Sequence, residues 1–280
     1  SYLPRGVKTF GYEPSDVTCL HGDVIIRDYF GPWWGPSFEA NLIISAAMFY
    51  SVDDPNSFVR LLASMLRPDG IWVCQMNDLQ ALVEQNCYDI IGHEHVCIWS
   101  LPSFARLVGR FGLEVYRAER NDVNGGSIRY YVQHHGVRPI QDSVRLQQAL
   151  DEAIDVQRLA ATVQDSIAAL RDLVMGAVST GRTVHLLGAS TRGTTIVQAV
   201  GLERYYVRMA SDPDPRKHGY LMPGTDIPIV PEEDSRAAKP DYYLVLIHAY
   251  LESVRVRERE FLERGGKFIL PLPAVRVEGA

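Results

Sequence analysis

The sequence lacks three features that mark particular classes of protein. Its four cysteines form no CxxC pair, so neither a zinc site nor a disulfide framework is indicated. No acidic or basic block accompanies the net charge of −6, which disfavours a nucleic-acid or anionic-membrane partner. The longest apolar run, around residues 42–50, is too short to cross a bilayer, and no signal peptide is visible. We therefore expect a cytoplasmic protein without a nucleic-acid or membrane partner.

The composition that is present is ordinary for a globular protein. Apolar residues make up 46% and charged residues 22% of the 280 positions, so the chain can bury the core of one large domain or two smaller ones. The sequence carries no signal for the oligomeric state.

Strands and helices alternate in the first half, which predicts an α/β fold. Residues 40–47 form a continuous apolar run, as a buried parallel strand does. A helix is predicted from Asp54-Pro55 to Leu66, and a strand follows at 71–75. Strand, helix and strand at this spacing predict a parallel, doubly wound sheet. Further strands are predicted at 7–12, 23–27, 115–120 and 127–133, with a helix at 101–111 and a turn at 124–126.

The second half repeats the alternation after a long helical stretch over 141–178. Strands are predicted at 183–187, 207–211, 242–247 and 267–270, with helices at 194–200 and 252–264. The sequence therefore predicts two Rossmann-like parallel-sheet units, at residues 1–136 and 137–280.

The densest chemical cluster is His93-Glu94-His95, in a stretch that reads as irregular. Imidazole titrates near neutrality and is suited to removing a proton beside a carbonyl. A zinc site is the competing interpretation, but the metalloprotease spacing on a helix is HExxH. A strand would place the two histidines on one face, and a surface turn is the plain alternative. No metal is expected.

A second candidate is the loop between a predicted strand and helix, from Gly188 to Gly193. Small residues such as Ser190 and Thr191 let backbone N–H groups approach a phosphate, and the helix N-terminus favours anions. Arg192 can add a charge-assisted contact. A tight turn without a ligand is the alternative.

Residues at the carboxyl ends of strands are candidates for cofactor binding, because ligands of open parallel sheets bind there. Glu13 ends the first strand and can accept hydrogen bonds from ribose hydroxyls, although a solvated loop carboxylate is the plainer interpretation. Phe30, Ser45, Ala46 and Tyr50 also follow strand ends, and core packing is the alternative for Tyr50.

Several stretches in one order resemble a known family. Residues 46–58 (AAMFYSVDDPNSF), 66–75 (LRPDGIWVCQ), 88–101 (YDIIGHEHVCIWSL) and 122–129 (DVNGGSIR) resemble the methyltransferase half of the sugar C-methyltransferases that use S-adenosyl-L-methionine. Residues 188–198 (GASTRGTTIVQ), 224–230 (GTDIPIV), 240–246 and 257–272 resemble their C-methyltransferase C-terminal domain. The resemblance covers nearly the whole chain.

The resemblance implies an enzyme of deoxysugar biosynthesis: a transferase that methylates a carbon of a nucleotide-linked keto-deoxysugar. His95 would remove the proton beside the ketone, Glu94 would orient that base or bind sugar, and His93 would assist. Glu13 would hold the cofactor ribose, with Phe30, Ser45 and Ala46 around the cofactor. The nucleotide sugar would lie against Tyr50 and the loop that contains Gly188, Ser190, Thr191 and Arg192.

Two family features are not seen in this sequence: the zinc module and the first glycine-rich loop of the cofactor site. Residue 1 is Ser and a strand follows closely, so we expect an N-terminally incomplete class I methyltransferase domain. Two other hypotheses stay open. One is a catalytically degenerate homologue that only binds nucleotide sugars. The other is an NAD-dependent oxidoreductase, which the absence of GxGxxG disfavours.

Overall fold

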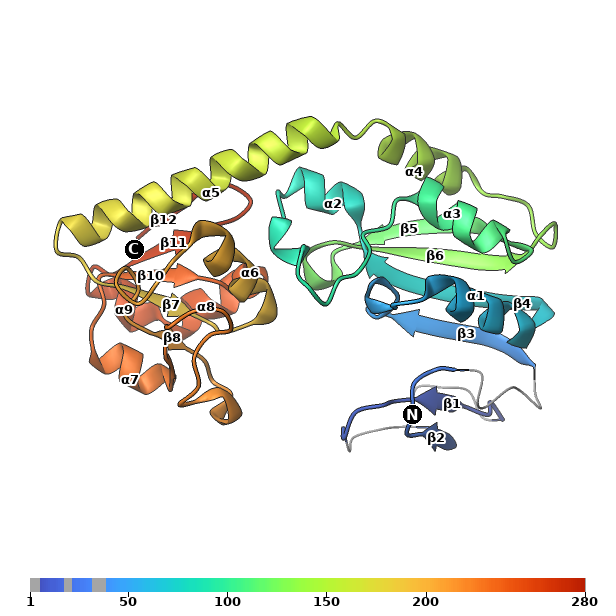
Figure 1. Ribbon diagram of the computed structural model, residues 1–280, viewed down its shortest axis with the longest axis horizontal. Coiled ribbons are helices and arrows are strands. Elements are labelled where there is room, and N and C mark those ends of the chain that lie inside the picture. The colour runs from blue at the N-terminus through green and yellow to red at the C-terminus, as the bar shows by residue number, and fades with distance from the viewer. Residues whose placement is uncertain (1–5, 18–21, 32–38, 280) are drawn as a thin grey trace.

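The computed structural model describes residues 6–17, 22–31 and 39–279. They form two α/β units that lie side by side (Figure 1). This confirms the predicted class of two Rossmann-like units. No helix in the described part of the chain combines the length and apolar character needed to span a membrane.

The first unit is built on a four-stranded sheet. Its order is β3-β4-β6-β5, with bounds Ala40–Ala46, Leu66–Asn77, Ser127–His134 and Leu113–Asn121. β3 and β4 are parallel, whereas β6 is antiparallel to both β4 and β5. The tight turn at 122–126 joins β5 to β6 as a hairpin, which confirms the strand pair and turn predicted for this stretch, and the parallel pairing is that of β3 with β4.

An aromatic core holds helices against one face of this sheet. α1 (Pro55–Met65) starts where the Asp54 carboxylate accepts two backbone N–H groups, and α3 (Leu101–Gly109) starts at a capping box between Ser100 and Ser103. Trp72 is fully buried, with its ring centroid 5.6 Å from that of Phe104 and 5.5 Å from that of Phe49. Both predicted helices are confirmed.

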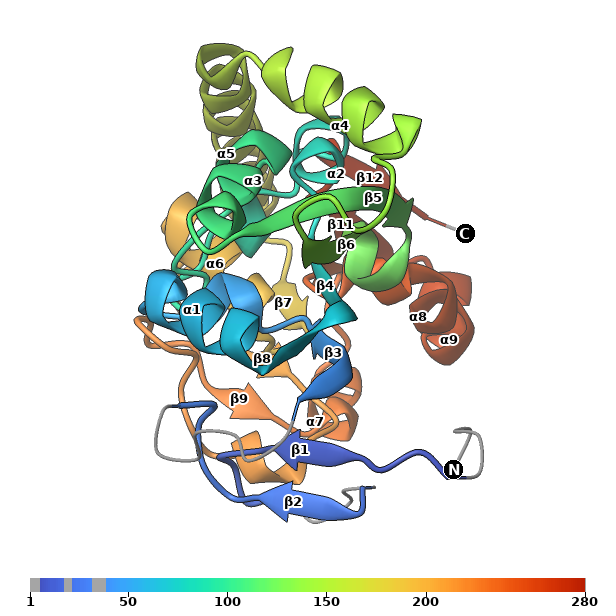
Figure 2. The ribbon, with the colours of Figure 1, turned by 90° about the vertical axis from the view of Figure 1, so that its right-hand side faces the viewer.

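The strand β3 differs from its prediction. Its continuous apolar run predicts burial on both faces, but Leu42 is 54% and Ile44 is 65% exposed. Among the described residues β3 pairs only with β4, so it forms an edge of the sheet. The strands β1 (Phe10–Tyr12) and β2 (Val24–Ile26) form a separate parallel pair, which Figures 1 and 2 show apart from β3.

The second unit has a six-stranded sheet of order β12-β11-β10-β7-β8-β9. All neighbours are parallel except β12, which is antiparallel to β11. The strands are Val184–Leu187 (β7), Ala210–Ser211 (β8), Ile229–Val230 (β9), Tyr242–Val245 (β10), Lys267–Leu270 (β11) and Arg276–Glu278 (β12). The helices are Thr191–Val200 (α6), Glu232–Ala237 (α7), Leu251–Arg257 (α8) and Arg259–Glu263 (α9). β9 and β12 have no counterpart among the predicted strands.

Two helices connect the units. The single helical run predicted over 141–178 is divided into α4 (Asp142–Glu152) and α5 (Val156–Ser179), because Asp155 caps the second helix. α4 is bound to the first unit, where the buried Asp151 carboxylate accepts the Leu101 N–H at 2.6 Å. α5 packs on the second unit and extends along it in Figure 1. Packing thus changes from one unit to the other between α4 and α5, and the predicted boundary after residue 136 stays a prediction.

Candidate active site

The segment after helix α2 (Leu79–Glu84) anchors one unit in the other. Tyr88, the first residue of the 3-10 helix η3 (Tyr88–Ile90), is 3% exposed and belongs to the hydrophobic core of the second unit. Asn86 donates to Ser166 Oγ of α5 at 2.9 Å. The chain that leads to the His93-Glu94-His95 cluster is therefore fixed at the seam between the two units.

The cluster itself is a turn. The His95 N–H donates to the Gly92 carbonyl at 3.0 Å, which places His93 and Glu94 at the exposed corners. The strand arrangement considered for this stretch does not form. Instead, the corner residues face the second unit and His95 faces the first.

His95 lies at the carboxyl edge of the first sheet. Its ring packs on Tyr50, which follows β3, with 4.3 Å between centroids. Its Nδ1 lies 2.5 Å from the Ile90 carbonyl oxygen and 3.4 Å from the side-chain nitrogen of Asn77, the last residue of β4. A carbonyl only accepts, so the shorter contact requires a proton on Nδ1 and leaves the Nε2 lone pair available in neutral histidine.

Tyr50 supplies a protonated hydroxyl beside this imidazole. Burial, and then the negative charge of Glu94, raises the pKa of Tyr50 above its ordinary value. Tyr50 therefore stays neutral at physiological pH and can donate a hydrogen bond. A base with a free lone pair and a neutral phenol, with their rings in contact, form a suitable pair for moving a proton beside a carbonyl.

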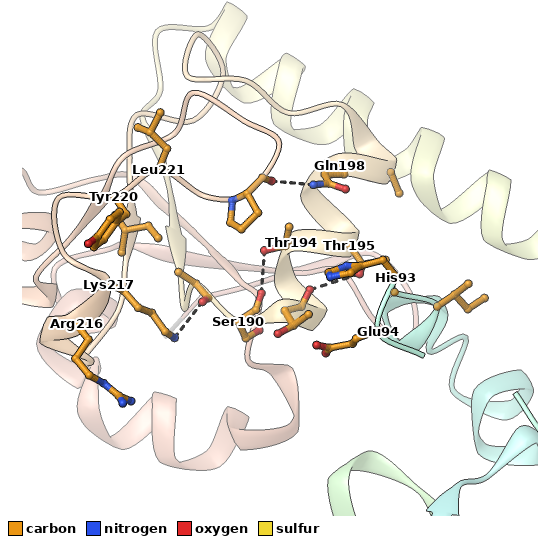
Figure 3. Close-up of a pocket in the computed structure, with 17 residues that line it drawn as sticks. His93, Glu94, Ser190, Thr194, Thr195, Gln198, Arg216, Lys217, Tyr220 and Leu221 are labelled. Atoms are coloured by element: carbon orange, nitrogen blue, oxygen red, sulfur yellow. Dashed lines mark hydrogen bonds between the residues drawn. The ribbon is translucent and has the colours of Figure 1, made fainter. Parts of the chain in front are cut away.

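His93 and Glu94 line a cavity of about 770 Å³ between the turn and α6 (Figure 3). The opposite wall is formed by Ser190, Thr191 and Thr195, and the far end by Lys217 and Tyr220. The size is that of a site for a sizeable small molecule. The sequence predicted His93, Glu94, Ser190 and Thr191 as site residues, and all four line this cavity.

Gly188 has a structural reason to be glycine. Its φ is +95°, and a Cβ there would lie 2.6 Å from Cγ2 of Ile247. It brings the β7–α6 loop close to the end of β10 and does not line the cavity. Ser190 caps α6 by accepting the Gly193 N–H at 3.0 Å. The small residues of this loop thus shape the wall, and Ala189, Ser190 and Thr191 line the cavity.

Arg192 does not face the cavity, which contradicts the predicted phosphate contact. Its guanidinium donates to both carboxylate oxygens of Asp89, at 2.6 and 2.9 Å, and to the Asn124 carbonyl at 2.9 Å. The Asp89 side chain is fully buried, so a phosphate from solvent does not replace it as the partner of Arg192. No sequence pattern pairs two residues this far apart in the chain.

Sequence reasoning missed two cations that line the cavity, Arg216 and Lys217. The Lys217 ammonium group donates there to the Ala189 carbonyl at 3.1 Å and to Asp212 at 3.0 Å. Asp212 also accepts the Ala189 N–H at 2.9 Å. The signal in the sequence was Asp212, the acidic residue that follows β8, because this position lies next to the ligand loop in dinucleotide-type sheets.

Comparison with known proteins identifies the family. The family profile described as the C-methyltransferase C-terminal domain matches residues 122–273, and one described as a methyltransferase domain matches residues 2–118. The chain belongs to the C-methyltransferase family. A relative, C-methyltransferase NovU of Streptomyces niveus, is 34% identical over 283 residues. The alignment covers 99% of this chain and 65% of NovU, so the chain spans just under two thirds of that relative's length.

Two solved structures show weaker similarity. Mitomycin 7-O-methyltransferase MmcR is 16% identical with a TM-score of 0.30, over 40% of this chain and 34% of that one. A complex of the Haloferax volcanii Trm112 methyltransferase activator with a methyltransferase gives 15% identity and a TM-score of 0.35, over 46% and 73%. TM-scores this low support no conclusion about the site of this C-methyltransferase family member.

The methyltransferase domain implies S-adenosyl-L-methionine as the methyl donor, and the described residues fit it in part. Glu13 follows β1, and hydrogen bonds from Ser15 hold the pKa of Glu13 below its usual range, so an ionised acceptor is present. Ala46 is exposed at the end of β3. These two positions suit a ligand at the carboxyl ends of strands.

The other two predicted cofactor residues serve packing in this C-methyltransferase family member. The buried Ser45 hydroxyl accepts the Trp72 indole N–H at 2.9 Å. The Phe30 ring packs between Phe58 and Tyr12, with centroid distances of 4.8 and 5.1 Å. The geometry therefore does not support a direct cofactor contact for the Ser45 hydroxyl.

One group of metal-ligand side chains occurs in the described residues, formed by Cys87, Asp89 and His248. Arg192 already supplies a cation there, since its guanidinium pairs with Asp89 and lies 3.4 Å from Nε2 of His248. Burial, and then the Asp89 charge, raises the pKa of Cys87 to about 11, so the thiol stays protonated. These residues are arranged around the Arg192 guanidinium, which takes the place that a metal ion would occupy.

Proposed function

We propose that this protein is a C-methyltransferase that uses S-adenosyl-L-methionine to methylate a carbon beside the ketone of a nucleotide-linked deoxysugar. The family membership and the C-methyltransferase relative support the class of reaction. The keto-sugar substrate, the roles of individual residues and a cytoplasmic location are part of this proposal. The observation that carries it is the position of His95 and the contact of its Nδ1 with the Ile90 carbonyl.

In this proposal His95 is the general base. The Ile90 carbonyl holds the Nδ1 proton, so Nε2 can accept the proton from the carbon beside the ketone. The electrons of that C–H bond then move into the enolate. Tyr50, which stays protonated, donates a hydrogen bond to the developing enolate oxygen.

S-adenosyl-L-methionine, when bound, would supply an electrophilic methyl group for the enolate carbon, with a neutral thioether as the leaving group. Glu13 is proposed to accept hydrogen bonds from the cofactor ribose, because it is an ionised residue at a strand end. His95 lies at the carboxyl ends of β3 and β4. In this proposal the proton and the methyl group are both transferred at that edge of the first unit.

The cavity between the turn and α6 is proposed to hold the nucleotide sugar. Glu94 and His93 line one wall and are suited to bind sugar hydroxyls. Ser190 and Thr191 begin α6, where backbone N–H groups favour a phosphate, and Lys217 adds a positive charge nearby. Tyr220 is 68% exposed at the end of the cavity and offers a ring for a base to stack on.

The test is exchange of the sugar α-proton with heavy water, followed separately from methyl transfer. His95→Gln should slow both exchange and methylation by about 10²–10⁴-fold, because a positioned base contributes that factor. His93→Ala separates the two proposed roles: it should weaken binding of the sugar but slow the exchange step at saturating substrate much less than His95→Gln, since His93 is exposed at the corner of the same turn and lacks the contact with Tyr50.

Parental exchange rates in His95→Gln would remove His95 as the base. Binding of the nucleotide sugar without exchange or methylation in the parent protein would favour a non-catalytic binding homologue instead.

A further inference from the structure

One buried ion pair joins the turn that carries His95 to the helix that lines the cavity. Asp89 lies in η3, and its carboxylate receives two N–H groups from Arg192 in the first turn of α6. The Asp89 side chain has no exposed surface, and that of Arg192 is 25% exposed. The guanidinium therefore fixes both the distance and the orientation between two elements of different units.

The same guanidinium binds a third segment. Its Nη1 donates to the carbonyl of Asn124, in the turn between β5 and β6. Asn124 and Gly125 have positive φ angles of 55° and 84°, and a Cβ on Gly125 would lie 3.6 Å from the guanidinium. The tight turn thus presents a carbonyl to Arg192, so that η3, α6 and the β5–β6 turn meet at one side chain.

The ion pair is connected directly to the proposed base. Asp89 precedes Ile90, whose carbonyl accepts the Nδ1 proton of His95. On the other side, Arg192 follows Thr191, which lines the cavity. Movement of Asp89 relative to α6 would therefore shift the Ile90 carbonyl and the His95 ring relative to the cavity wall.

A role in stability alone does not explain this arrangement. Taking a carboxylate and a guanidinium out of water is costly, and a buried ion pair is commonly no better than a well-packed apolar pair. Two units that needed only to adhere could do so through apolar contacts such as that of Tyr88. What the charged pair adds is a defined geometry with several directed hydrogen bonds.

We propose that the Asp89–Arg192 ion pair is a positioning device, which aligns the His95 imidazole with substrate held against α6. This inference rests on the proposed function. Both residues act through others: Asp89 through the Ile90 carbonyl and Arg192 through the first turn of α6. Neither contacts the reacting atoms.

The variants that test it are Arg192→Lys, which keeps the charge but loses the two-pronged contact, and Asp89→Asn, which keeps the shape. We expect kcat for methylation and the α-proton exchange rate to fall by about 10- to 100-fold, since small misplacement of a catalytic group has effects of this size. The KM for the nucleotide sugar should change by less than about threefold, because the groups that contact it remain.

The matched control is Arg236→Lys. Arg236 donates to both carboxylate oxygens of the buried Glu258, at 2.6 and 3.0 Å, but that pair lies inside the second unit. Arg236→Lys should lower the thermal midpoint about as much as Arg192→Lys and leave kcat within about twofold of the parent. The two variants share a loss of stability but, over the residues that the structure describes, Arg236 has no contact with the turn that carries His95.

A second measurement does not depend on turnover. Amide hydrogen exchange of the His95 and Cys97 N–H groups, which donate to Gly92 and Tyr50, should accelerate by about tenfold or more in Arg192→Lys and Asp89→Asn, but not in Arg236→Lys. Arg192→Lys and Asp89→Asn with parental kcat and parental amide exchange would overturn the inference. If the parent protein neither exchanges the α-proton nor methylates, the proposed function fails, and amide exchange alone decides whether the pair positions the turn.

Discussion

Replacing Tyr88 with Phe should make the protein more stable, contrary to the usual effect of a buried substitution. The ring is 3% exposed and packs in the core of the second unit, so Phe keeps those contacts. The hydroxyl is buried and has no hydrogen-bond partner among the described residues. Removing it relieves a desolvation cost without breaking a bond.

The expected gain is about 1–2 kcal/mol in the free energy of unfolding, which is the range for one unsatisfied buried hydroxyl. For a chain of this size that corresponds to a rise in the thermal midpoint of roughly 2–8 °C, at about 2–4 °C per kcal/mol. Calorimetry at pH 7 measures it directly.

Tyr243→Phe provides the matched control. Tyr243 is 1% exposed in the same unit, but its hydroxyl is hydrogen-bonded to Ser235 Oγ at 3.1 Å. This variant should lose about 1 kcal/mol, because a satisfied buried bond is removed. The two tyrosine-to-phenylalanine changes should therefore shift the midpoint in opposite directions. Destabilisation of Tyr88→Phe to the same extent as Tyr243→Phe would refute the reasoning.

The pH dependence of folding stability provides a second test of the environment of Tyr88. Burial, and then the Asp89 charge, raises the pKa of Tyr88 to about 12 from an ordinary value near 10. Between these pH values the unfolded chain loses the proton while the folded chain keeps it, so folding stability falls as pH rises from about 10 to 12. Below pH 10 both states are protonated and this contribution is constant. Tyr88→Phe should remove this contribution to the loss of folding stability at alkaline pH.

Two further predictions concern Lys217 and His185. Lys217→Met should raise the KM for the nucleotide sugar by about 10- to 100-fold with kcat nearly intact, since it removes a charged donor from the cavity. Arg145→Met, on α4 and outside the cavity, has a side chain that is 76% exposed and should change KM by less than about threefold in the same steady-state assay. Burial lowers the pKa of His185 to about 4, so the unfolded chain gains a proton first as pH falls from about 6.5 to 4, and about 3 kcal/mol of stability is lost over that range. Urea unfolding of His185→Gln should lack this loss, and an unchanged acid dependence would contradict it.

Most of the fold could be predicted because its long elements carry strong periodic signals. The helices at 55–65 and 101–109 have caps and an apolar face, and the strand pair at 113–134 is divided by an Asn-Gly-Gly turn. The strands β9 and β12 were not predicted, because each has only two or three residues and lacks a longer strand pattern around it: β9 lies between Pro228 and Pro231, and β12 is charged at both ends. The exposure of Leu42 and Ile44 was also not predictable, since neighbours and not composition decide whether an apolar strand is covered.

The candidate site was predictable as a set of segments and less so as a set of contacts. The turn at His93 and the loop at Ser190 were identified from residue type, and the structure places both on one cavity. Arg192 was assigned to a phosphate because an arginine beside a helix N-terminus can add a charge-assisted contact to an anion. Its actual partner, Asp89, is distant in sequence, and only the docking of the two units brings the charges together.

The anchoring of Tyr88 and Asp89 in the second unit has a consequence for recombination between relatives. A chimera that joins the first unit of one C-methyltransferase to the second unit of another would naturally be cut between α4 and α5, where the packing changes. Such a cut leaves Tyr88 and Asp89 with the parent that supplies the first unit, although their side chains are bound in the second. Residues 86–90 therefore have to travel with the donor of the second unit, as a short graft far upstream of the crossover.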